Sequence, residues 1–196
     1  MTAMKTLRHP LIATVFLISG LLVSSLFSTF SSAADPAKII FGIELGTRFL
    51  IPLCARGEDT MAKRYCYAEA LSVKTAWGSE EHHVFYPRAE TVPWARGEMI
   101  VDVANGVIEA IHINTWGIEA QTLALDAMTK KYGPPTRSHV EKIKGLRSRW
   151  PTKYAEWELK DFSVKLDGTT GSVDWGRVTL ATPSYRKRLK AHNPGR

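Results

Sequence analysis

Residues 99–113, MIVDVANGVIEAIHI, hold the pattern that decides the fold. Two apolar runs flank Asn105-Gly106, a dipeptide that readily supplies the two positive φ angles of a type I′ turn. The sequence therefore predicts a β-hairpin formed by residues 99–104 and 107–113. Neither face is cleanly polar, so we expect either a bulge that shifts the register or cover on both faces. With a two-residue loop, one face would hold Met99, Val101, Val103, Ile108, Ala110 and His112.

Residues 118–132 predict an α-helix directly after this hairpin. Apolar residues recur there at helical spacing, from Ile118 through Met128 to Tyr132. Gly133 suits the left-handed position that follows a helix, and the two prolines after it forbid continuation. Acidic Glu119 near the start and two lysines near the end match the helix macrodipole.

Shorter apolar or alternating stretches predict further strands on both sides of the hairpin and helix. A hairpin, a helix and then antiparallel strands predict an α+β fold, in which one main α-helix packs on one face of an antiparallel β-sheet. We expect residues 35–185 to form this single domain. The predicted additional strands are residues 39–46, 65–73, 83–86, 154–160, 162–166 and 175–182.

The first 34 residues have the pattern of a secretory signal peptide. Lys5 and Arg8 give a positive start, residues 11–30 carry no charge, and small residues follow up to Ala34. This order predicts cleavage near Ala34 and a mature protein that is periplasmic or secreted. An uncleaved membrane anchor is the alternative, because about 20 apolar residues span a bilayer. A lipoprotein is disfavoured, since the first cysteine, Cys54, lies far beyond the apolar run.

Cys54 and Cys66 are the two cysteines of the chain. In an oxidising compartment such a pair most simply forms one disulfide, which would stabilise the fold by about 3 kcal/mol. It would hold the polar residues 55–65 against the rest of the domain. A redox-active pair is the alternative, but it needs a Cys-x-x-Cys spacing or a paired base, and the sequence indicates neither.

The formal net charge of +7 is distributed unevenly. Residues 35–185 contain 19 basic and 19 acidic residues, so net charge does not support a nucleic-acid-binding face. The excess lies in the signal peptide and in residues 186–196, a basic C-terminal tail without an acid. This tail would either make weak contact with an anionic membrane surface or form a solvated, frayed terminus, and the second interpretation is favoured.

Few residues are candidates for catalysis or metal binding. Glu80-Glu81-His82-His83 could attract zinc or copper, but neighbours on an extended chain point to opposite sides, and a solvated loop is the favoured interpretation. His112 would need an acid within reach to act as a general base, and Asp102 and Glu109 are expected on the other face of the hairpin. The motifs of nucleophilic hydrolases, phosphate loops and dinucleotide sites do not occur. The sequence predicts no catalytic residue, no metal and no cofactor.

Residues 137–153, RSHVEKIKGLRSRWPTK, are the clearest candidate binding segment. Arg and Trp carry hot spots in protein interfaces, so Arg147, Arg149 and Trp150 are the candidate binding residues. The alternative is a charged loop between helix and sheet, with Trp150 tucked beneath it. Further tryptophans near predicted turns suit a recognition surface or packing under loops: Trp77, Trp94 and Trp116.

Residues 115–134 carry a resemblance to a known family. Gly117 before the helix, Gly133 and Pro134 after it, and the strands that follow resemble the pattern of BamE-like (SmpA/OmlA) and beta-lactamase-inhibitor-protein-like domains over residues 99–180. The resemblance implies a binding or assembly scaffold without catalysis. The chain departs from the lipoprotein members because no anchor cysteine ends its apolar run. Residues 42–46, with the two cysteines, resemble secreted proteins without a known activity.

Together these features predict an exported, non-enzymatic binding or accessory protein of the bacterial envelope. Its partner would be a protein or an envelope component. The alternative is a small periplasmic hydrolase or metal-binding protein that uses His112 or the pair His82 and His83.

Overall fold

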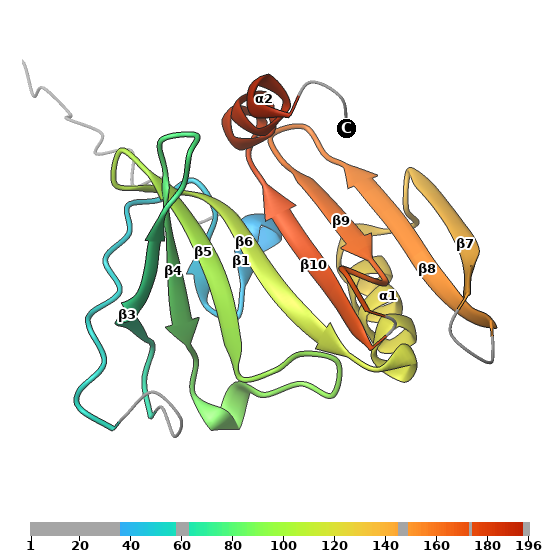
Figure 1. The fold of residues 1–196 in the computed structure, drawn as a ribbon, viewed down its shortest axis with the longest axis horizontal. Coiled ribbons are helices and arrows are strands. Elements are labelled where there is room, and N and C mark those ends of the chain that lie inside the picture. The colour runs from blue at the N-terminus through green and yellow to red at the C-terminus, as the bar shows by residue number, and fades with distance from the viewer. Residues whose placement is uncertain (1–35, 58–62, 145–148, 173, 194–196) are drawn as a thin grey trace, which may run out of the picture. The chain divides into compact units, whose positions relative to one another are not determined.

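The computed structural model describes residues 36–57, 63–144, 149–172 and 174–193. Its main element is an eight-stranded antiparallel sheet with the strand order β3-β4-β5-β6-β10-β9-β8-β7 (Figure 1). Within these ranges no helix is both long and apolar enough to cross a membrane. The predicted signal peptide lies outside them. The strands are β3 (Cys66–Lys74), β4 (Glu80–Phe85), β5 (Glu98–Ala104), β6 (Val107–Trp116), β7 (Arg137–Lys144), β8 (Arg149–Glu158), β9 (Ser163–Asp167) and β10 (Trp175–Ala181).

The sheet consists of two four-stranded meanders that follow one another in the sequence. Strands β3 to β6 form the first, helix α1 (Ile118–Tyr132) follows, and strands β7 to β10 form the second, so that β10 pairs with β6 at the centre. The predicted helix is confirmed, and it packs mainly against β8 and β6. One main helix on an antiparallel sheet makes the fold broadly α+β, as predicted.

The predicted hairpin is confirmed, and it contains a bulge. Asn105 and Gly106 form the turn between β5 and β6 with φ angles of 52° and 74°. Beyond the turn Val103 pairs with Ile108, but Asp102 pairs with Ala110, which leaves Glu109 as the extra residue. The bulge changes which residues share a face, because the side-chain period of a strand is two. The predicted face is therefore wrong beyond the bulge: Met99 and Val101 share a face with Ile111 and Ile113, while His112 lies on the face of Asp102.

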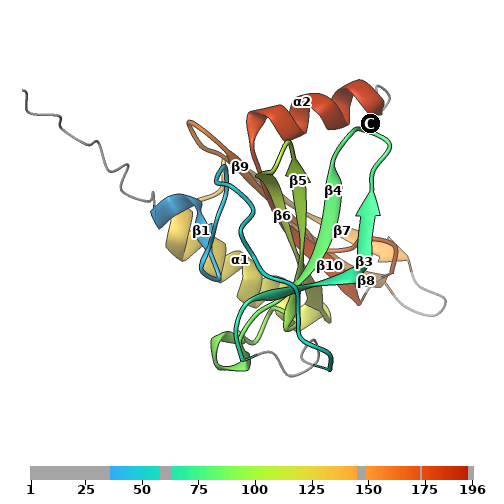
Figure 2. The same ribbon diagram turned by 90° about the vertical axis from the view of Figure 1, so that its left-hand side faces the viewer.

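The core lies between the sheet and α1. The buried side of the helix presents Ala120, Ala124 and Met128, which belong to one cluster with Trp157 and Leu180 of the sheet. The N-terminal segment covers the same side of the first meander, and Figure 2 shows β1 and α1 together on one side. This face is covered because most of the side chains that its strands present there are apolar.

The N-terminal segment corrects one prediction. Residues 39–46 do not form one strand but two short ones, β1 (Ile39–Ile40) and β2 (Ile43–Glu44), which pair with each other after a 3-10 turn at Pro36–Lys38. Phe41 and Gly42 make the turn with φ angles of 45° and 72°. The tight turn places Ile40 and Ile43 on the core side, where both are buried.

Two segments predicted as loops are strands. Glu80–His83, interpreted as a solvated loop, belongs to β4, and Arg137–Lys144, for which a charged loop was one interpretation, forms β7. β7 is an edge strand that is exposed along most of its length, so it lacks the apolar alternation by which half-buried strands are recognised. Its charged side chains also protect a free sheet edge from pairing with another chain.

The C-terminal tail is mostly helical. Residues 186–192 belong to α2 (Pro183–His192), which starts with a cap in which the Thr182 hydroxyl accepts a hydrogen bond from the backbone N–H of Tyr185. Tyr185 packs against Ala110 and Ala181, which alternate along their strands with the residues under α1. The two helices thus lie on opposite faces of the sheet, and the interpretation of residues 186–192 as a frayed terminus is wrong (Figure 2).

Candidate functional site

The predicted binding residues lie at the β7–β8 hairpin. Arg149 and Trp150 begin β8, and both are exposed, Trp150 to 41%. Trp150 pairs with Ile143 of β7, so it is part of the sheet and is not packed beneath a loop. Arg147 lies outside the described residues. Both described members of the predicted site are therefore accessible to a partner.

A second set of arginine and tryptophan side chains gathers on the central strands, at the same end of the sheet as the β7–β8 hairpin. Arg96 comes from the loop before β5, Trp116 ends β6, and Trp175 begins β10. The guanidinium carbon of Arg96 lies 4.5 Å from the ring centroid of each tryptophan, and the two indoles meet edge to face at 4.7 Å. Each contact is a cation–π interaction. We call these three residues the Arg96 cluster.

The backbone fixes the Arg96 cluster in place. Trp116 and Trp175 are paired residues of β6 and β10, so their side chains leave the sheet together. The hydroxyl of Tyr86 donates a hydrogen bond to the carbonyl of Arg96, and burial, followed by the charge of Glu98, raises the pKa of Tyr86 to about 12. Trp116 nevertheless stays 51% exposed. The cluster is thus an ordered aromatic and cationic surface that faces solvent.

The Arg96 cluster continues into an open sheet face. We use this name for the side opposite α1, between α2 and the β7 edge. Polar side chains on it pair across neighbouring strands: Arg177 with Asn114 at 3.2 Å, and Arg137 with Glu156 at 2.7 Å. A shallow pocket of about 440 Å³ lies over β7, β8 and β9, where the rings of His139 and Tyr154 stack at 4.9 Å. The residues lining this pocket are Arg137, His139, Glu141, Tyr154, Ala155, Glu156, Lys165, Leu166 and Asp167.

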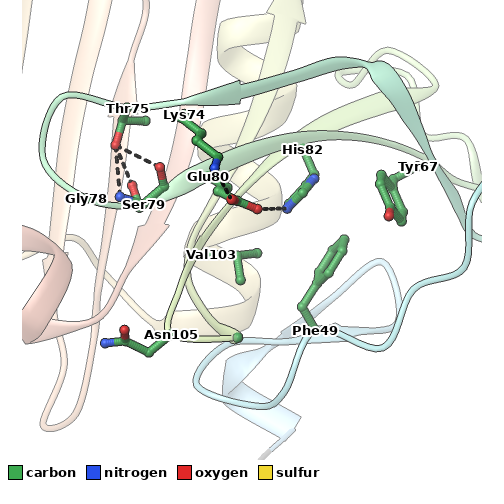
Figure 3. A pocket seen from close by; sticks show the side chains of 11 residues that line it. Phe49, Tyr67, Lys74, Thr75, Gly78, Ser79, Glu80, His82, Val103 and Asn105 are labelled. Atoms are coloured by element: carbon green, nitrogen blue, oxygen red, sulfur yellow. Dashed lines mark hydrogen bonds and ion pairs between the residues drawn. The ribbon is translucent and has the colours of Figure 1, made fainter.

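A larger pocket of about 570 Å³ lies on the core side of the first meander. It opens between the β3–β4 turn, the β5–β6 turn and the N-terminal segment (Figure 3). His82 forms part of its wall and is mostly buried because the ring of Phe49 stacks on it at 4.6 Å and Tyr67 meets it edge-on. We call this cavity the His82 pocket.

One hydrogen bond and one longer contact with a carboxylate orient the imidazole of His82. Its Nδ1 lies 2.9 Å from the hydroxyl of Ser72, and its Nε2 lies 3.7 Å from the carboxylate of Glu80. Burial lowers the pKa of His82, although the nearby charge of Glu80 partly opposes this shift. Glu80 also pairs with Lys74 at 3.8 Å. The pocket wall thus presents a neutral imidazole beside a paired carboxylate.

The predicted metal candidates are separated by the strand. His82 faces the pocket, while His83 lies on the other face of β4 with Glu98 at 3.9 Å. Across the described ranges, no three His, Cys, Asp or Glu side chains lie together in a way that could hold a metal ion. His82 and His83 therefore do not form one site.

His112 lies beneath α2. Its Nδ1 is 3.1 Å from the Thr179 hydroxyl and its Nε2 is 3.4 Å from the Tyr185 hydroxyl, and the residue is only 6% exposed. Burial, and secondarily the charge of Arg177, lowers the pKa of His112 to about 3. The ring is a polar core residue whose two nitrogens both have partners.

The basic residues of α2 are partly used within the fold. Arg188 pairs with Glu109 and, at 3.7 Å, with the fully buried Asp102, and Arg186 pairs with Glu158 at 2.7 Å. Lys187 and Lys190 are exposed. The charge available to an anionic surface is therefore smaller than the sequence of the tail suggests.

The predicted disulfide is confirmed. Cys54 and Cys66 are joined, with an S–S distance of 2.11 Å. The bond ties the N-terminal segment to the start of β3, next to backbone hydrogen bonds that join Cys54 and Pro52 to Tyr67. The N-terminal wall of the His82 pocket is thus covalently fastened to the sheet.

Sequence reasoning did not assemble either the Arg96 cluster or the His82 pocket. Their members are far apart along the chain, and the only signal was the number of tryptophans near turns. Neither a family model, nor a curated protein, nor a solved structure matches this chain. Function is therefore inferred from the geometry.

Proposed function

We propose that this protein is an exported, non-enzymatic binding protein of the bacterial envelope, and that it contacts a protein or another envelope component through its open sheet face. The Arg96 cluster carries the proposal. Trp and Arg are the residue types that dominate interface energies, and here they are both ordered and accessible. The sequence resemblance to binding and assembly scaffolds points the same way.

Export is supported by two independent features. The N-terminal pattern is that of a cleaved signal peptide. The disulfide between Cys54 and Cys66 is compatible with an oxidising compartment. Weak contact of the exposed Lys187 and Lys190 with an anionic membrane surface is a secondary proposal.

We expect the mature protein to begin at Ala34 or Asp35 and to contain no free thiol. Intact-mass measurement of protein purified from a bacterial periplasm or culture medium, with and without thiol alkylation, checks both points. The expected mass lacks the leader and does not change on alkylation under non-reducing conditions. Protein recovered from the cytosol with Met1 retained and both thiols alkylated would contradict export.

We expect a photo-crosslinking amino acid at Trp116 to capture a partner in cells that make this protein. The same probe at Leu123 is a matched control, because Leu123 is 43% exposed and belongs to α1 on the opposite side of the sheet. Adducts should form from position 116 and not from position 123. Arg96→Ala should reduce them about tenfold, since removal of one hot-spot side chain typically costs more than 1 kcal/mol.

The crosslinking experiment has clear contrary outcomes. Equal adducts from positions 116 and 123 would indicate non-specific contact. Adducts that persist unchanged in Arg96→Ala would remove the cluster from the binding surface. A probe at Trp150 decides whether the predicted residues at the β7–β8 hairpin belong to the same surface.

A catalytic function that uses a histidine is the second candidate. His82 favours it, because the imidazole is oriented by Ser72 and lines a pocket beside Glu80. His112 does not favour it in this conformation, since α2 covers the ring. Substitution of His82 by asparagine should leave crosslinking from position 116 intact if binding is the function.

A further inference from the structure

The His82 pocket is a second site on the other side of the sheet from the Arg96 cluster. We propose that it binds a neutral saccharide of one or two sugar rings. This inference is independent of the proposed partner surface, because the two sites share no residue. It rests on the size of the pocket, its fixed rim, its balanced charges and the distribution of rings and polar groups on its walls.

The pocket is large enough and its rim is fixed before any ligand arrives. Its volume of about 570 Å³ is in the ordinary range for small-molecule sites. In the β3–β4 turn the hydroxyls of Thr75 and Ser79 lie 2.8 Å apart, and the Ser79 hydroxyl donates a 3.0 Å hydrogen bond to buried Asp102. A preformed rim reduces the entropy lost on binding.

The charges of the pocket compensate one another. The ammonium of Lys74 and the carboxylate of Glu80 form an ion pair at 3.8 Å. Burial of His82 favours its neutral form. The ion pair gives the pocket one charge of each sign and no net charge, which favours a ligand without net charge.

The walls divide into an apolar end and a polar end. Phe49, Tyr67 and His82 form a cluster of three rings at one end, while Glu80 and Lys74 lie near the middle and Asn105 lies at the other end (Figure 3). Asn105 is exposed, and its amide both donates and accepts hydrogen bonds. A sugar ring matches this division, since its C–H face is apolar and its hydroxyls each donate and accept.

Other ligand classes fit the same walls less well. A purely apolar ligand would cover Glu80 and Lys74 without replacing their hydrogen bonds to water, which is costly. A metal ion lacks a suitable set of ligands in the described part of the chain. A hydroxyl-rich neutral ring is the class that uses both ends of the pocket.

The test is a titration of ¹⁵N-labelled full-length mature protein, followed by NMR. The probes are two neutral disaccharides, cellobiose and N,N′-diacetylchitobiose, with the anion glucuronate as comparison. We expect saturable shifts of the amide signals of Gly78, Ser79 and Gly106 with at least one disaccharide, at millimolar concentration. Glucuronate should bind at least about tenfold more weakly, because the carboxylate meets a site whose cation is already paired.

Two variants link the shifts to the pocket. Glu80→Gln removes the carboxylate, and Asn105→Gly removes the amide while keeping a residue that tolerates the positive φ of the turn. Each should weaken binding about tenfold, as expected for loss of one ligand hydrogen bond. Glu81→Gln is the matched control, because the neighbouring side chain points to the opposite face of β4.

The outcomes separate this inference from the proposed function. Absence of shifts with both disaccharides would overturn it, as would shifts centred on Trp116. It would also be overturned if Glu80→Gln and Asn105→Gly both bound as tightly as the natural protein. Tighter binding of glucuronate would overturn the argument from charge. Arg96→Ala should leave the titration unchanged, and Glu80→Gln should leave crosslinking from position 116 unchanged, so either proposal can fail alone.

Discussion

Lowering the pH from about 7 to about 4 should destabilise the folded protein, and replacing His112 with glutamine should remove most of that dependence. His112 is buried beneath Tyr185 of α2, and both ring nitrogens contact hydroxyl groups. A proton added to this ring would place a charge in a buried site and near Arg177. The folded state therefore resists protonation of His112.

The direction of this pH dependence follows from the protonation of His112 in the unfolded and in the folded state. In the unfolded chain the ring takes up a proton near its ordinary pKa of 6.5, whereas the pKa of His112 in the folded state is lowered to about 3. Between these values the unfolded state binds more protons, so the free energy of unfolding falls as the pH falls. The loss is about 1.4 kcal/mol per pH unit at most, or several kcal/mol in total.

Protonation of Asp102 has the opposite effect on the stability of the folded state. Burial raises the pKa of Asp102 above its ordinary value, and this outweighs the hydrogen bond from Ser79 and the charge of Arg188. The folded state therefore takes up a proton at Asp102 before the unfolded state does, and it gains stability as the pH falls through that raised pKa. The total pH dependence contains both effects, so only a comparison of variants isolates His112.

Urea denaturation at a series of pH values measures the effect. His112→Gln keeps a polar side chain under α2 but does not titrate, so its curve should be flatter than that of the natural protein by up to about 1.4 kcal/mol per pH unit. Tyr185→Phe is the control, since it lowers stability but keeps the imidazole buried and thus keeps the slope. Parallel curves for the natural protein and His112→Gln would show that His112 does not govern acid stability.

The elements that could be predicted are those with local signals. The turn at Asn105-Gly106 needs two residues with positive φ, and that requirement is visible in the dipeptide itself. The helix 118–132 shows its apolar spacing and its stop signals within one continuous stretch. In both cases the residues that determine the structure are neighbours in the sequence.

The wrong predictions concern segments whose structure depends on residues that are distant in the sequence. His112 was assigned to the wrong face because the bulge at Glu109 depends on how β5 and β6 pair. The strand β7 is mostly polar on both sides, so its sequence shows no strand pattern. It is recognised as a strand only by its pairing with β8. The basic tail folds as a helix because acids on the sheet, including Glu109, lie where its arginines can meet them.

The candidate sites were even less visible from the sequence. Arg96, Trp116 and Trp175 come from three elements, and no spacing between them is regular. Trp175 begins a predicted strand, and nothing in the sequence indicates that it shares the Arg96 guanidinium with Trp116. His82 was expected in solvent, yet Phe49, a residue of the N-terminal segment, covers it.

Replacing Gln121 with methionine should cost about 2–5 kcal/mol of stability, because it would leave one buried and one half-buried backbone group without their partners. Gln121 is 1% exposed and lies in the first turn of α1, on the buried side of the helix. Its amide nitrogen donates a 2.8 Å hydrogen bond to the carbonyl of Gly168, and its amide oxygen accepts a 3.0 Å bond from the backbone N–H of Lys153. One side chain thus joins the helix to two neighbouring segments of the second meander.

The close packing around Gln121 allows no simple replacement of these bonds. A Cβ atom added at Gly168 would lie 2.5 Å from the carbonyl oxygen of Lys153 and 2.6 Å from the amide oxygen of Gln121, so the backbone of Gly168 packs closely against both residues. Leu123→Ala in the same helix is the control, and it should cost less than about 1 kcal/mol because that side chain is largely exposed. Chemical denaturation of both variants measures the difference. A loss in Gln121→Met no larger than that in Leu123→Ala would show that the helix is held on the sheet by apolar contact alone.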